Sequence, residues 1–104
     1  MNNEAIKKIA ENNGFDEASR QLFEEVAELI VASNKYHRNS KKPKKTPSDC
    51  VSEQYLISQI VGEIADVTIM IEQIKYLLGI KAADVEEIVD FKLNRQLERI
   101  EKNE

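Results

Sequence analysis

Two short acidic patterns stand out in the sequence, Glu24-Glu25-x-x-Glu28 and Glu63-x-x-Asp66. Because an α-helix turns by about 100° per residue, residues three positions apart project from one face. Two such helices side by side would gather these carboxylates, which repel one another and raise one another's pKa values. A hard divalent cation relieves that repulsion, and oxygen-only ligands favour Mg²⁺, Mn²⁺ or Ca²⁺ over zinc. The two patterns together predict a magnesium site between facing helices.

Each acidic pattern also has a purely structural explanation. Glutamate is a good helix former, and a string such as that at 24–28 is common on exposed helix faces. Glu63 lies within an apolar stripe, where an acid is costly unless it is paired or metal-bound. A salt bridge to Lys92 or Arg95 would satisfy it, and so would a position at the edge of the bundle that reaches water. The occurrence of both patterns in one chain favours the metal.

The composition predicts a single all-α domain over residues 1–104. The chain has 104 residues, is 41% hydrophobic and 33% charged, and contains three glycines and two prolines. It is too apolar for a disordered chain and too poor in turn-forming residues for a many-stranded β protein. A chain of this length buries only about two-thirds of its unfolded surface when it folds alone. Oligomerisation would therefore add stability.

Several classes of function are disfavoured. A formal charge of −4 argues against a general nucleic-acid binder. Cys50 is the only cysteine and His37 the only histidine, so neither a disulfide, a zinc framework nor a histidine-bearing di-iron centre is expected. The start of the chain lacks the pattern of a signal peptide, and no apolar run is long enough to span a membrane. A cytoplasmic protein without membrane contact is expected.

Helical periodicity predicts four helices, at about 3–13, 16–38, 51–78 and 84–102. Gly14 and Gly79 are expected to stop the first and third. Residues 39–49, with two prolines and four lysines, predict a basic loop between the acidic helices. The third helix is apolar nearly all round and needs cover on several sides. A bundle of four to five helices, completed by dimerisation, is therefore expected.

The sequence resembles the all-α nucleoside triphosphate pyrophosphohydrolases. Their EExxE…ExxD signature matches Glu24-Glu25-x-x-Glu28 and Glu63-x-x-Asp66, and the similarity extends from about residue 15 to residue 99. That superfamily includes the MazG proteins, dimeric dUTPases and phosphoribosyl-ATP pyrophosphohydrolases. The chain looks nearest to small MazG-like proteins, although the long loop at 39–49 departs from compact members.

The resemblance implies a role for each matching residue. The ligands of Mg²⁺, or of Mn²⁺ as an alternative, would be Glu25, Glu28, Glu63 and Asp66. Either Glu24 or Glu25 would act on the attacking water as the catalytic base. Substrate contacts would come from the terminal helix, through Lys92, Asn94 and Arg95.

The expected activity is hydrolysis of a nucleoside triphosphate between its α and β phosphates, giving a monophosphate and pyrophosphate. The resemblance also implies a homodimer or homotetramer. Two alternatives stay open. One is a non-catalytic helical module that binds a nucleotide or a protein, and the other, within the enzyme class, is a phosphoribosyl-ATP pyrophosphohydrolase.

Overall fold

The fold is described by a computed structural model that covers residues 1–43 and 52–103. In these residues it contains three α-helices and no strand: α1 (Asn3–Lys41), α2 (Glu53–Leu78) and α3 (Ala82–Asn103). The predicted all-helical class is confirmed for this part of the chain. No described helix combines the length and the apolarity that crossing a membrane requires. The predicted loop begins later than expected, because 39–41 are still helical, and its positions 44–49 lie outside the described residues.

Helix α1 joins the first two predicted helices into one element. It begins after Asn2, whose side chain accepts a hydrogen bond from the Ala5 amide at 3.1 Å and so caps the helix. Gly14 interrupts the helical backbone at the position where the sequence predicts a stop. Its backbone angles (φ 79°, ψ 172°) are non-helical, a conformation that side chains disfavour, and they produce a kink between two helical segments.

Helix α2 has well-defined caps at both ends. The Ser52 side chain accepts a hydrogen bond from the Tyr55 amide at 3.3 Å. Gly79 is left-handed (φ 66°, ψ 29°), and the next amide, that of Ile80, donates to the Lys75 carbonyl at 2.9 Å. This is the glycine stop that the sequence predicts.

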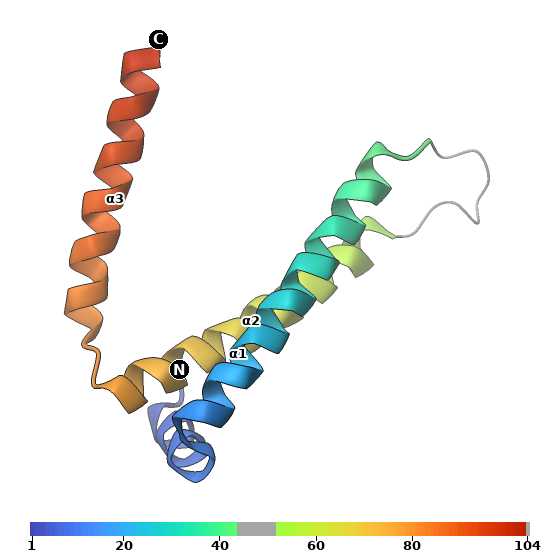
Figure 1. Ribbon diagram of the computed structural model, residues 1–104. Coiled ribbons are helices and arrows are strands. Elements are labelled where there is room, and N and C mark those ends of the chain that lie inside the picture. The colour runs from blue at the N-terminus through green and yellow to red at the C-terminus, as the bar shows by residue number, and fades with distance from the viewer. Residues whose placement is uncertain (44–51, 104) are drawn as a thin grey trace.

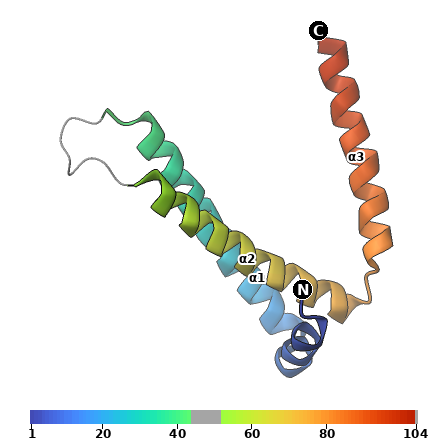
Figure 2. The same cartoon turned by 180° about the vertical axis from the view of Figure 1, so that it is seen from behind.

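The second segment of α1 and helix α2 form an antiparallel hairpin (Figures 1 and 2). Alanines supply half of the buried apolar side chains at this contact, which lets the two backbones approach closely. On α2, Leu56 and Met70 are buried, whereas Ile57 and Ile64 on other faces of the helix remain exposed. The buried apolar residues are Ile6, Ala10, Ala18, Ala32, Leu56 and Met70.

Two tyrosines connect the helices at opposite ends of the hairpin. The Tyr36 hydroxyl, late in α1, donates to the Glu53 carboxylate at 2.8 Å, in the first turn of α2. The Tyr76 hydroxyl, late in α2, donates to Glu11 near the start of α1. Because the contacts lie at both ends, they favour one register of the two helices.

Helix α3 projects away from the hairpin (Figure 1). In the described part of the chain it packs against neither α1 nor α2, and each of its residues is exposed. An amphipathic helix without a partner leaves an apolar face in water. The large exposed apolar residues of α3 are Val85, Ile88, Val89, Phe91, Leu93, Leu97 and Ile100.

Candidate metal centre

The antiparallel packing of α1 and α2 gathers carboxylates that are far apart in the sequence. Glu25 and Glu28 lie on one face of α1, and Glu63 faces them from α2. One carboxylate oxygen of each residue lies within 4.8 Å of those of the other two. Oxygens at this separation can share one cation, and hard carboxylate oxygens are the donors that Mg²⁺ and Mn²⁺ prefer.

Two oxygens of this cluster are enclosed and have no partner. The Oε2 atoms of Glu25 and Glu63 are shut off from solvent and accept no hydrogen bond from any described residue. An enclosed carboxylate oxygen without a partner is costly, and it becomes tolerable when the group binds a proton or a cation. The orphaned oxygens therefore fit a divalent cation, which would satisfy both of them.

Two acids of the cluster, Glu25 and Glu63, hold their protons more tightly than ordinary carboxyls. Burial, followed by the negative charges of Glu28, Asp66 and Glu63, raises the pKa of Glu25 to about 7. Burial also raises the pKa of Glu63, with further contributions from Glu28 and Asp66. Cation binding would displace these protons, so affinity for the metal should increase with pH.

Asp66 lies beside this cluster. Its charge acts on both Glu25 and Glu63, and it lines the same cavity as Glu28 and Glu63. That cavity has a volume of about 420 Å³, within the range of ligand sites in proteins. Its remaining walls are Val31, Ala32, Lys35, Gln59 and Gly62.

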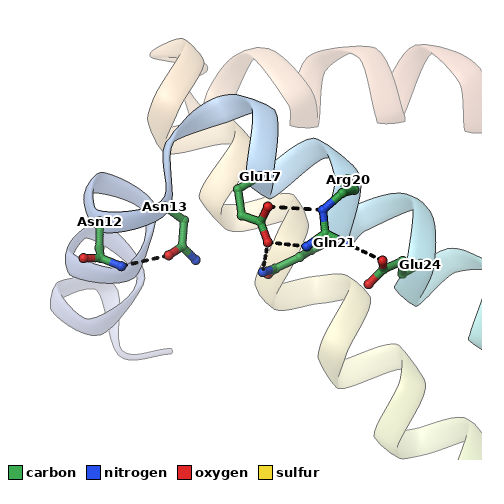
Figure 3. A network of polar contacts seen from close by, with 6 residues as sticks. All are labelled: Asn12, Asn13, Glu17, Arg20, Gln21 and Glu24. Atoms are coloured by element: carbon green, nitrogen blue, oxygen red, sulfur yellow. Dashed lines mark hydrogen bonds and ion pairs between the residues drawn. The ribbon is translucent and has the colours of Figure 1, made fainter.

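Glu24 is not part of the cluster. Its side chain is 57% exposed and pairs with Arg20, one turn earlier in α1 (Figure 3). The same guanidinium also binds Glu17, which accepts a further hydrogen bond from Gln21 at 2.9 Å. Glu24 therefore belongs to a surface network on α1, separate from the three acids that the fold gathers.

The predicted substrate contacts on the terminal helix lie elsewhere in the single chain. Lys92, Asn94 and Arg95 are exposed residues of α3, which does not pack against the hairpin that carries the acids. Arg95 stacks over the ring of Phe91, with 5.9 Å between the guanidinium carbon and the ring centre. One copy of the chain therefore brings together Glu25, Glu28, Glu63 and Asp66 without these three residues.

Lys35 and Gln59 were not predicted as site residues, yet they line the cavity beside the acids. Lys35 follows Glu28 by seven residues, about two helical turns, so both lie on one face of α1. This spacing is the signal that could have identified Lys35. Gln59 precedes Glu63 by four residues on α2, but nothing in its residue type indicated a role.

The whole arrangement is a carboxylate cluster beside a cavity of ligand size. It can hold a hard cation, and through that cation an anionic group such as a phosphate. Comparisons of the chain with protein families, with curated proteins and with solved structures gave no match.

Proposed function

We propose that the protein is a Mg²⁺-dependent nucleoside triphosphate pyrophosphohydrolase of the MazG-like type. It would cleave the bond between the α and β phosphates and release a monophosphate and pyrophosphate. The observation that carries the proposal is the contact between Glu25 and Glu28 on α1 and Glu63 on α2, with two enclosed oxygens lacking a partner. The similarity of the acidic patterns to the all-α pyrophosphohydrolases supports the same reaction.

All four acids would hold the metal ion, and one of them would also accept a proton. Glu25, Glu28, Glu63 and Asp66 would hold the ion, Mg²⁺ or alternatively Mn²⁺, from two helices at once. When bound, such an ion neutralises phosphate charge and makes a coordinated water more acidic. Of the two candidate bases, Glu24 is engaged by Arg20 whereas Glu25 lies in the cluster. We therefore assign acceptance of the water's proton to Glu25.

A second copy of the chain would complete the bundle. Helix α3 packs against no other helix in the described part of the chain, and its large apolar residues are exposed. Packing α3 against another copy would bury that face and add helices to the two-helix hairpin. In such a homodimer, or in a homotetramer, Lys92, Asn94 and Arg95 would approach the phosphates from the neighbouring copy.

The proposal is tested with a panel of ribo- and deoxyribonucleoside triphosphates, incubated with Mg²⁺ or with EDTA, followed by separation of the products. We expect monophosphate and pyrophosphate in the presence of Mg²⁺ alone, and the preferred base would emerge from the same panel. Diphosphate and orthophosphate would show that a different bond is cleaved. The chain would be a binding module instead if it hydrolysed neither the panel nor phosphoribosyl-ATP, while Mg²⁺ and nucleotide still raised its melting temperature.

A further inference from the structure

A second cavity adjoins the one that contains the acids. It has a volume of about 510 Å³ and shares Lys35 and Gln59 with the acidic cavity, so the two are neighbours along the contact between α1 and α2. Its other described lining residues are Arg38 and Asn39 from α1, Lys42 directly after α1, and Tyr55 and Leu56 from α2. Among the described residues, the acidic cavity is lined by Glu28, Glu63 and Asp66, whereas the second is lined by three cationic side chains and no acid. The two cavities together are thus acidic at one end and basic at the other.

The basic end has positive charge available for a ligand. In residues 1–43 and 52–103, neither Lys35 nor Arg38 has a carboxylate within ion-pair distance. Both line the second cavity, which is open to solvent, and both are exposed there. On the opposite wall, the Tyr55 hydroxyl accepts a hydrogen bond from Gln59 at 3.0 Å, which leaves its own O–H hydrogen to be donated. Ammonium, guanidinium and hydroxyl donors facing one cavity are the groups that bind phosphate oxygens.

The distance along α1 between the acids and the basic residues fits a ligand with two anionic parts. One part would bind the metal ion held by the acids, and the other would bind the basic residues. Lys35 lies about 10 Å beyond Glu28 along the helix axis, and Arg38 about 15 Å beyond it, at 1.5 Å per residue. A simple anion would occupy only the basic end. A polyphosphate can reach both ends, because one phosphate binds the cation held by the acids while the next ones continue toward the cations of the protein.

We infer that the cavity formed by Lys35, Arg38 and Tyr55 binds the terminal phosphates of a polyphosphate substrate. The metal would hold the phosphate nearer the nucleoside, and the pyrophosphate part would lie along α1 toward Lys42. This inference rests on the proposed function for the metal at the acidic end, and it adds to it a direction for the substrate. In this arrangement the phosphate contacts come from the same chain as the acids and do not require α3.

The test is binding of inorganic tripolyphosphate to the full chain in the presence of Mg²⁺, measured by calorimetry. Replacing both cations (Lys35→Ala with Arg38→Ala) should weaken binding by about tenfold or more, because charged hydrogen bonds are lost. Lys8→Ala removes one exposed lysine of α1 outside both cavities and is the control for the single variant Arg38→Ala. Arg38→Lys should retain more affinity than Arg38→Ala because it keeps the charge. Thermal unfolding of each variant confirms that it is folded.

The outcomes separate this inference from the proposed function. Tripolyphosphate affinity that is unchanged in the double variant overturns the inference, even when the wild-type chain hydrolyses nucleotides. Loss of affinity in the double variant supports it, even when no nucleotide is hydrolysed. A loss in Lys8→Ala equal to that in Arg38→Ala would show that general charge, not this cavity, attracts the anion. Preference for a single-stranded oligonucleotide over tripolyphosphate would assign the two cavities to nucleic acid and also overturn the inference.

Discussion

Glu25 on α1 and Glu63 on α2 face each other across the hairpin, and each has an enclosed Oε2 atom without a hydrogen-bond partner. The two residues are 38 positions apart in the sequence, so only the packing of the helices makes them neighbours. Two carboxyl groups at close range, each with one enclosed oxygen that no described residue satisfies, destabilise the hairpin that holds them. A destabilising pair at one defined position favours a functional reason for these two residues. The effects of replacing them can be measured.

Replacing Glu63 by Gln should raise the stability of the metal-free chain and lower its activity. The amide carries no charge, so the repulsion with Glu28 and Asp66 disappears and the chain in EDTA should melt at a higher temperature than the wild type. Turnover should fall by more than about 100-fold, beyond the loss typical of residues that only support metal ligands. Glu101→Gln, an exposed acid near the end of α3, is the control and should change neither property. A fully active Glu63→Gln variant would refute the metal assignment.

The stability of the metal-free chain should decrease as the pH rises from about 5 to 8. The pKa of Glu25 in the fold is about 7, above the ordinary 4.5, so the folded chain keeps a proton that the unfolded chain releases in this interval. Stability contributed by that proton is present below about pH 4.5 and is lost as the pH rises through 7. The raised pKa of Glu63 acts in the same direction. A hydrogen bond from Arg20 lowers the pKa of Glu17, so the contribution of Glu17 to stability changes only at a pH below this interval.

Thermal melts at pH 5, 6, 7 and 8, with EDTA and with excess Mg²⁺, check this pH dependence. We expect Mg²⁺ to raise the melting temperature most at pH 8, because bound metal requires deprotonated carboxylates. The double variant Glu25→Gln with Glu63→Gln should lose both the pH dependence and the response to Mg²⁺. If the double variant kept the wild-type pH dependence, other groups would be responsible for it.

Self-association should depend on the apolar face of α3. Leu93 and Leu97 are 51% and 58% exposed in the single chain, and burying a leucine contributes about 2 kcal/mol. Leu97→Asp should therefore weaken association by at least about 30-fold, measured as mass against concentration by light scattering or ultracentrifugation. The neighbouring Gln96→Glu change adds the same charge without removing an apolar contact, and it should have a much smaller effect. A wild-type chain that stays monomeric at every concentration would contradict the proposed second copy.

The hairpin should be sensitive to the size of Ala18. This side chain is fully buried between the helices, seven residues before Glu25 on α1. Ala18→Leu should cost about 1–3 kcal/mol through overpacking, and it should weaken the response to Mg²⁺ because the helices are forced apart. Ala27→Leu, at an exposed position of the same helix, is the control. Equal stability and equal Mg²⁺ response in Ala18→Leu and the wild type would show that the helices can accommodate the larger side chain.

The boundaries of the helices were largely predictable, because local signals determine them. The left-handed Gly79 ends α2 where its position after the apolar stripe predicts, and α3 begins within two residues of the expected start. Gly14 interrupts the helical backbone where the sequence predicts a stop, because it adopts a conformation that side chains disfavour. The angle at this kink could not be predicted, since it depends on tertiary packing and not on the local sequence.

The sequence by itself determined the all-helical class and the acids that could hold a metal, since helical periodicity and i,i+3 spacing are properties of the local chain. The tertiary structure decided which of those acids meet. Antiparallel packing brings Glu63 to Glu25 and Glu28, whereas Glu24 turns to Arg20 on the surface. The same packing places Lys35 beside the acids and leaves Lys92 and Arg95 on a helix that extends away. Spacing along one helix reports a shared face, but the register between two helices depends on side-chain packing across the whole contact.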